Sequence, residues 1–269
     1  MIRGKTLFFR SLLVAGPLWA GLAGCTTVPV TGRSSLNLVD EKSVVAASNE
    51  AFAEMKKSLK ISRDPKMNAM MDRVCTRLTE SLDFWAMPLA EWEFVVFDAP
   101  KTINALAMPG GKIAVFSGIF DVAKTDDELA VVLGHEIAHV TAKHVNEKLS
   151  RQMLVNAGGI GLLAGTGGTL TGLAVLTAYK SETGMYGLSF DRNKETEADH
   201  IGLIYMARAG FNPRAAITLW ERMNSSVVGK EAPEEWLSTH PSNENRLARL
   251  YGWMDEAEAE YQKARSQTQ

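Results

Sequence analysis

Residues 134–140 read Gly-His-Glu-Ile-Ala-His-Val and contain the pattern His-Glu-x-x-His, which we expect in the middle of a helix. Thr125 and Glu128 fit a capping box that begins this helix. Apolar residues from Leu129 to Val140 recur at helical spacing and predict a largely buried helix over residues 126–150. Two imidazoles and a carboxylate in such a helix need partners, because burying unpaired polar groups is costly.

A metal ion is the partner that the pattern predicts. Residues four apart lie on one face of a helix, so His135 and His139 can bind the same ion. Glu136 follows the first histidine and can act as a general base towards a water that the ion activates. Zinc makes such a water acidic near neutral pH. The pattern therefore predicts a hydrolytic zinc enzyme, most simply a peptidase.

A catalytic zinc normally has three protein ligands, so the sequence should supply one more. His144 lies about 180° round the predicted helix from the first motif histidine, and we expect it on the surface. Glu195 and Asp199 share a face of a second predicted helix; this pair suits a ligand and a carboxylate that accepts the free ring N–H of a ligand histidine. Glu197 points about 160° away from Glu195. The alternative interpretation of this segment is an acidic helix start favoured by the helix dipole.

The N-terminal residues predict export and lipidation. Three basic residues precede an apolar stretch over 11–22, which is too short for a comfortable membrane span. The stretch ends in Leu-Ala-Gly-Cys, which resembles a bacterial lipobox, so we expect residues 1–24 to be a lipoprotein signal peptide and Cys25 to carry the lipid. Residues 25–39 would then be a lipidated tether. Thr26, by resemblance to lipoprotein sorting, favours the outer membrane. The alternative is a plain signal peptide.

Residues 40–269 are long enough for one domain, and we predict an α+β fold that is mainly helical. Strands are expected at 92–97, 103–108 and 112–116, the last two joined as a hairpin by a type II turn at Pro109-Gly110. The formal net charge is −2, and no dense basic patch occurs, which excludes nucleic acid as a partner.

Residues 152–179 carry no charge and are rich in glycine. The glycines favour two short helices with a break, which would pack beside the active site or touch the membrane surface. The alternative is a membrane span, which would make the chain an integral-membrane peptidase.

Together these motifs resemble the gluzincin zinc metallopeptidases of the HtpX, BepA and Oma type. The resemblance rests on His135-Glu136-x-x-His139, on Asn104-Ala-Leu-Ala-Met-Pro-Gly-Gly before it, on Glu195-Thr-Glu-Ala-Asp199 after it, and on a late His240-Pro with Arg246. It covers about residues 40–250, and the lipobox makes the chain similar to the short outer-membrane lipoproteins of that family. It implies a zincin-like metallopeptidase domain with a small β-sheet beside the active-site helix.

The resemblance also implies the roles of the site residues. His135, His139 and Glu195 would bind one zinc ion per chain, Glu136 would be the catalytic base, and Asp199 would orient a ligand. His240 or Arg246 would stabilise the oxyanion or occupy the open position at rest; alternatively, His240 is only a helix cap.

The predicted substrates are unfolded or misfolded envelope proteins, cleaved in protein quality control by an enzyme on the outer membrane that faces the periplasm. Its partners would be the membrane, through Cys25, and the outer-membrane assembly machinery. We expect the strand containing Lys112, Ile113, Ala114 and Val115 to pair with an extended substrate, close to Asn104. The alternative function is a chaperone or assembly factor with a structural zinc, against which an intact Glu136 argues.

Overall fold

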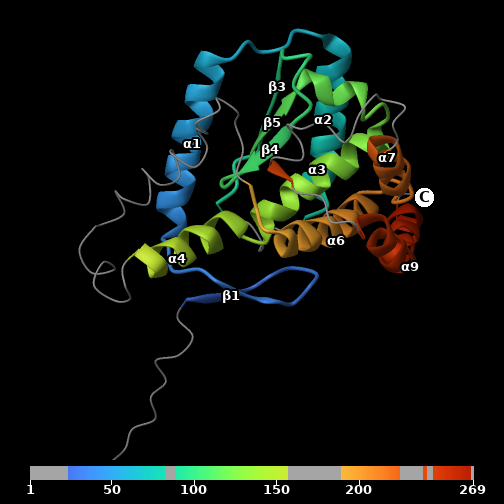
Figure 1. Ribbon diagram of the computed structural model, residues 1–269. Coiled ribbons are helices and arrows are strands. Elements are labelled where there is room, and N and C mark those ends of the chain that lie inside the picture. The colour runs from blue at the N-terminus through green and yellow to red at the C-terminus, as the bar shows by residue number, and fades with distance from the viewer. Residues whose placement is uncertain (1–23, 83–88, 157–188, 225–238, 241–244, 268–269) are drawn as a thin grey trace, which may run out of the picture.

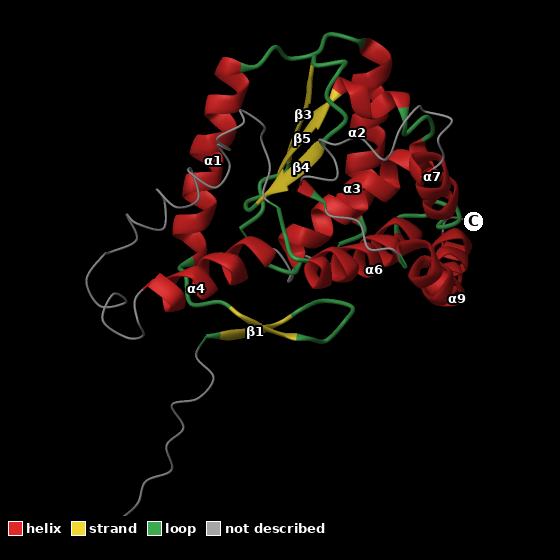
Figure 2. Cartoon of the chain, viewed as in Figure 1, coloured by secondary structure: helices red, strands yellow, loops and turns green. Residues whose placement is uncertain are grey.

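The computed structural model describes residues 24–82, 89–156, 189–224, 239–240 and 245–267 (Figure 1). The described helices are α1 (Glu41–Ser58), α2 (Pro65–Glu80), α3 (Asp126–Thr141), α4 (His144–Asn156), α6 (Arg192–Arg208), α7 (Ala215–Asn224) and α9 (Arg246–Gln267). The strands are β1 (Cys25–Thr27), β2 (Ser34–Leu36), β3 (Glu93–Phe97), β4 (Ala105–Met108) and β5 (Lys112–Phe116). This arrangement, coloured by type in Figure 2, confirms the predicted α+β, mainly helical fold.

The main sheet has the strand order β3-β5-β4. β4 and β5 form the predicted antiparallel hairpin, whose turn is closed by a hydrogen bond from Gly111 N to Met108 O (3.2 Å). Gly110 has φ of 89°, which the third position of a type II turn requires and which glycine adopts without strain. β3 pairs with β5 in parallel, so the central strand of the three is β5.

Helices cover both faces of this sheet, which explains why its strands read as continuous apolar runs. Leu106 and Ala114 point to the face covered by α1 and pack with Phe52. Ala107 and Ile113 point to the opposite face, in the core that α2 and α3 complete. In Figure 1 the sheet lies between α1 and the pair α2 and α3. The helix α3, which contains the His-Glu-x-x-His motif, therefore lies directly beside the sheet.

Local capping signals set most helix starts as predicted. Asp64 accepts from Lys66 N and Met67 N at the start of α2, and Thr125 Oγ1 accepts from Glu128 N (3.2 Å) at the start of α3. The helix predicted over 126–150, however, is two helices. α3 ends at Thr141, and Lys143 adopts φ of 55° before α4 begins at His144.

Two glycines let α3 and α6 approach closely. A Cβ on Gly134 would meet Gly202 O at 2.8 Å, and a Cβ on Gly202 would meet His135 N at 2.6 Å. Both distances are shorter than real Cβ contacts, so only glycine fits at this crossing. Glu195, Asp199 and Gly202 lie on one face of α6 because they are four and three residues apart. The crossing therefore brings both carboxylates onto the motif.

The residues predicted as a tether form the β1–β2 hairpin, which lies below α4 and α6 in Figure 1. Arg33, in its loop, contacts Glu147 of α4 and Glu197 of α6. Most of the segment 152–179 lies outside the described residues, as does the predicted signal peptide up to residue 23. Within the described ranges, no helix is long and apolar enough to cross a membrane.

Candidate metal centre

Four buried side chains from three parts of the chain converge on one point. His135 and His139 of α3 bring their Nε2 atoms within 3.1 Å of each other. Glu195 of α6 lies 3.3 Å from the first of these nitrogens through Oε2 and 3.4 Å from the second through Oε1. His240, which precedes α9, places Nδ1 3.2 Å from His135 Nε2. These residues offer four ligand atoms that all lie within 4.8 Å of one another.

The spacing of these atoms fits zinc. Ligand bonds of about 2.0–2.1 Å in a tetrahedron place neighbouring ligand atoms about 3.3–3.4 Å apart, and His135 Nε2 lies 3.1–3.3 Å from His139 Nε2, Glu195 Oε2 and His240 Nδ1. Glu195 Oε1 is buried and has no hydrogen-bond partner among the described residues, as expected for an atom that should bind an ion. Imidazole and carboxylate are also ligands that zinc prefers.

The charges of the centre also fit a divalent cation. Glu136, Glu195 and Asp199 are buried carboxylates, and Arg246 offsets one of their three charges. When no ion is present, bound protons neutralise part of the remaining negative charge. Burial would lower the pKa of His135, but hydrogen bonds to Asp199 and Glu195 raise it to about 10. Burial raises the pKa of Glu136 above its ordinary value. An ion would displace the proton from His135, which couples metal binding to pH.

Asp199 and Arg246 hold the ring of His135 in place. Asp199 Oδ1 lies 2.9 Å from His135 Nδ1, so it accepts the ring N–H that leaves Nε2 free for the ion. Arg246 donates to both oxygens of Asp199, from Nε at 2.5 Å and from Nη2 at 3.0 Å, and its guanidinium stacks 3.8 Å from the centre of the Trp220 ring. Asp199 thus contacts a motif histidine, and its role in orienting a metal ligand stays a prediction.

Glu136 lies between the ligand cluster and the edge of the sheet. Its Oε2 accepts from the backbone N–H of Ala107 in β4 (3.3 Å), which orients the carboxylate. Its Oε1 lies 3.2 Å from His240 Nε2 but has no hydrogen-bond partner among the described residues. A buried carboxylate with a raised pKa is suited to take up a proton near neutral pH.

His240 and Arg246 occupy different places, although the sequence treated them as one element. His240 lies in the cluster itself, with Nδ1 also 3.3 Å from Glu195 Oε2. Arg246 is the first residue of α9 and contacts Asp199 and Glu195 behind the ligands. Arg246 therefore orients the carboxylates of Asp199 and Glu195. It does not occupy the open coordination position of the ion.

The predicted substrate-binding strand requires a correction. Lys112, Ile113, Ala114 and Val115 belong to β5, which is paired on both sides, so its backbone is not available to a peptide. Their side chains are buried, since packed helices cover both faces of the sheet. Asn104 is also buried, and its Oδ1 accepts from Ala105 N. The error arose because a hairpin pattern does not reveal a third strand that pairs in parallel.

His144 and Glu197 also belong to the centre, although the sequence interpretation did not include them in it. His144 is 1% exposed rather than on the surface, and its Nδ1 lies 2.8 Å from His139 Nδ1. The break after Thr141 redirects the chain, so the angle predicted from a continuous helix does not apply. Glu197 faces away from the cluster as predicted, yet it contacts His144 Nε2 at 3.0 Å. No glycine or proline marks the break, and hence the sequence carries no signal for it.

Comparison with known proteins identifies similar chains. The mitochondrial metalloendopeptidase OMA1 of Schizosaccharomyces pombe is 35% identical over 231 residues, which cover 86% of this chain and 67% of that protein. OMA1 of Saccharomyces cerevisiae is 36% identical and is covered over 50% of its length. The beta-barrel assembly-enhancing protease of Escherichia coli is 28% identical over 82% of this chain and 46% of that protein. The chain thus spans about half to two thirds of the length of these relatives.

These relatives contradict the predicted location on the bacterial outer membrane. The two yeast relatives, like those from human and Arabidopsis thaliana, are named as mitochondrial proteins of eukaryotes and not as proteins of a bacterial outer membrane. The prediction relied on the basic and apolar N-terminal residues, on the Leu-Ala-Gly-Cys pattern and on Thr26, all of which are short local signals. Cys25 is exposed at the start of β1, and its lipidation stays a prediction.

The family itself is established by a match over most of the chain. Residues 46–254 match the family described as Peptidase family M48, a range that includes all four cluster residues. This match confirms the resemblance to peptidases of the Oma and BepA type that the motifs indicated. The chain belongs to peptidase family M48.

Proposed function

We infer that the chain is a zinc-dependent endopeptidase that cleaves unfolded or misfolded proteins in protein quality control. The observation that carries this proposal is the position of Glu136 beside a buried cluster of ligand atoms spaced for zinc. A structural zinc site has no use for a buried carboxylate beside the ligands that does not itself bind the ion. The names of the relatives, metalloendopeptidase and assembly-enhancing protease, support the same class of activity.

His135, His139 and Glu195 would hold the ion. Zinc in such a site supplies Lewis acidity, which polarises the scissile carbonyl and makes water more acidic. Asp199 keeps the ring of His135 in the tautomer that binds, and Arg246 keeps Asp199 ionised and oriented.

Glu136 moves the proton in this proposal. Its Oε1 takes a proton from the attacking water and then delivers it to the nitrogen of the leaving amine. Burial raises the pKa of Glu136, which makes it a stronger base than an exposed glutamate. The hydrogen bond from Ala107 N to Oε2 leaves Oε1 to face the cluster.

His240 occupies the remaining position of the cluster in this structure. Its Nδ1 lies 3.2 Å from His135 Nε2 and 3.3 Å from Glu195 Oε2, so it would act as a fourth ligand and block access. The resting enzyme is then closed, and His240 must move before a substrate carbonyl can enter. A ring that has left the cluster could donate a hydrogen bond to the oxyanion.

The edge of the sheet suggests the kind of substrate. β4 is an edge strand of the described sheet and lies next to the site, with Ala107 N turned towards Glu136. An extended peptide could pair with this edge and place its backbone along the ligand cluster. Pairing of this kind requires an unfolded segment. The Escherichia coli relative is named for β-barrel assembly, and an assembly partner stays a prediction for this chain.

The test compares Glu136→Gln with Glu128→Gln. Both replace a buried glutamate of α3, but Glu128 pairs with Arg222 and lies outside the cluster. With casein as an unfolded substrate, Glu136→Gln should retain one zinc ion and lose nearly all cleavage. Glu128→Gln should keep both. Cleavage at the wild-type rate by Glu136→Gln, or a wild-type protein without bound metal, would refute the proposal.

A further inference from the structure

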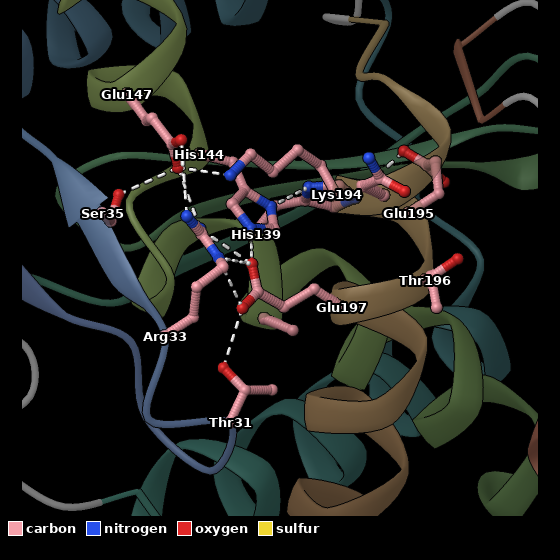
Figure 3. Close-up of polar contacts among 12 residues, drawn as sticks. Thr31, Arg33, Ser35, His139, His144, Glu147, Lys194, Glu195, Thr196 and Glu197 are labelled. Carbon is pink, nitrogen blue, oxygen red and sulfur yellow. Dashed lines mark hydrogen bonds and ion pairs between the residues drawn. The ribbon is translucent and has the colours of Figure 1, made fainter.

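A buried series of polar contacts runs from the ligand His139 to the N-terminal hairpin (Figure 3). We propose that His144, Glu197 and Arg33 are positioning residues of the metal centre, which together hold His139 in the tautomer whose Nε2 can bind the ion. The inference rests on the zinc site of the proposed function. It makes the hairpin, which is far from the motif in sequence, a part of that site.

The contacts are short and continuous. His139 Nδ1 lies 2.8 Å from His144 Nδ1, and His144 Nε2 lies 3.0 Å from Glu197 Oε2. All three side chains are buried, with exposures of 2%, 1% and 8%. Phe190 stacks on the ring of His139 at 4.3 Å between centroids, which fixes the plane of that ring.

The carboxylate determines the direction of the hydrogen bonds. An ionised Glu197 only accepts, so the proton of the neutral His144 ring lies on Nε2. Nδ1 of His144 is then an acceptor and must receive the N–H of His139 Nδ1. His139 Nε2 is left with its lone pair directed at the ligand cluster. The opposite tautomer of His139 would place a proton where the ion binds and two lone pairs against each other.

Arg33 and Thr31 hold the carboxylate at the end of the series. Arg33 Nε donates to both oxygens of Glu197 at 2.9 Å, and Thr31 Oγ1 donates to Oε1 at 2.7 Å. The guanidinium also reaches Glu147 of α4, with Nη2 2.8 Å from Oε2. Figure 3 shows Arg33 rising from the hairpin between Glu147 and Glu197. Arg33 therefore links Glu197 of α6 to Glu147 of α4 and fixes the position of the Glu197 carboxylate.

The two ligand histidines have matching supports. His135 donates to Asp199, which Arg246 holds, and His139 donates through His144 to Glu197, which Arg33 holds. A carboxylate that orients a ligand histidine typically contributes 10–100-fold to metal affinity or activity. Because His144 only relays the hydrogen bond, we expect the same size of effect on His139. The break at Lys143 is what turns His144 towards His139.

The first experiment reads the tautomer directly. Heteronuclear NMR of the imidazole nitrogens in the full chain, labelled at histidine, should show His139 protonated on Nδ1 and His144 on Nε2. The same protonation pattern should be seen in the metal-free and in the zinc-loaded protein. A metal-free protein in which His139 carries its proton on Nε2 would overturn the inference, whatever the protein's activity.

The second experiment measures zinc affinity by competition with a chelator. His144→Leu removes both hydrogen bonds and should weaken zinc binding about 10–100-fold. His144→Asn can still offer an acceptor to His139 Nδ1 and should recover most of that loss. Arg33→Lys cannot fork between two carboxylates and should lower affinity as well. Glu197→Gln should behave likewise, whereas Glu128→Gln is the matched control and should bind as the wild type does.

The outcomes separate the inference from the function. A wild type that binds no zinc would refute the zinc peptidase, while the NMR result on the metal-free protein would still decide the tautomer. Wild-type zinc affinity in folded His144→Leu and Glu197→Gln would overturn the inference and leave the peptidase intact. If His144→Leu does not fold, Glu197→Gln and His144→Asn carry the comparison.

Discussion

Replacing Gly202 by alanine should damage the metal centre from a position outside it. The new Cβ would lie 2.6 Å from His135 N and 2.7 Å from Gly134 C, both backbone atoms, where ordinary contact begins at 3.4 Å. Relief of the overlap requires α3 and α6 to separate by about 0.8 Å, the difference between 3.4 and 2.6 Å. A metal site tolerates ligand displacements of about 0.2 Å. Glu195 would therefore lie too far from His135 and His139 to bind the same ion at normal ligand distances.

The expected losses follow from the same overlap. Overpacking at a close contact costs about 1–3 kcal/mol, and alanine regains about 0.5–1 kcal/mol of helix propensity, so we expect a net destabilisation of about 1–2 kcal/mol. For a domain of this size, that lowers Tm by about 2–8 °C. Zinc affinity should fall more than about 10-fold, because the third ligand moves with α6.

Gly252→Ala is the matched control. Gly252 lies in α9, and a Cβ there would meet nothing within 4 Å. This variant should gain about 0.5–1 kcal/mol and bind zinc as the wild type does. Calorimetry of the metal-free proteins and chelator competition would measure the two effects. Wild-type Tm and zinc affinity in Gly202→Ala would show that the close helix crossing does not position the ligands.

Three further predictions follow from single contacts. His240→Ala should weaken zinc binding yet raise the rate of casein cleavage, because Nδ1 of His240 fills the cluster; a fall in rate would refute the blocking role. Lys143→Gly should stabilise the protein by about 0–1 kcal/mol in chemical denaturation, since it relieves a φ of 55° and loses only a partly exposed ion pair with Glu41; clear destabilisation would contradict this. Burial would raise the pKa of Glu147, but Lys194 and Arg33 outweigh it and bring it to about 2. The folded pKa is below the ordinary 4.5, so this stabilisation is complete above about pH 4.5 and is lost as pH falls towards 2. Circular dichroism should then show a flatter acid-unfolding curve for Glu147→Gln, and superimposable curves would count against it.

Much of the fold was predictable because its signals are local. Asp64 and Thr125 cap the helices that follow them through hydrogen bonds two or three residues away. Gly110 permits the turn of the hairpin by its own backbone conformation. The parallel pairing of β3 with β5 was not predictable, since it depends on a contact that no turn residue specifies. The same holds for the hairpin at residues 25–36, whose position depends on Arg33 and two distant glutamates.

The candidate site likewise has a part that local sequence spacing predicts and a part that depends on tertiary contacts. His135, Glu136 and His139 follow from helical spacing alone, and Glu195 with Asp199 follows from the same rule on a second helix. That these two helices meet depends on Gly134 and Gly202, which a motif search does not weigh.

The sequence by itself thus determined which polar side chains of a helix share a face, because a four-residue spacing fixes the face of any helix. Tertiary structure alone decided how those side chains are supported. A left-handed residue at Lys143 ends α3 without any helix-breaking residue, and this turns His144 inward against His139. Arg33 reaches the same place from more than a hundred residues away, because two buried carboxylates meet there and its guanidinium pairs with both.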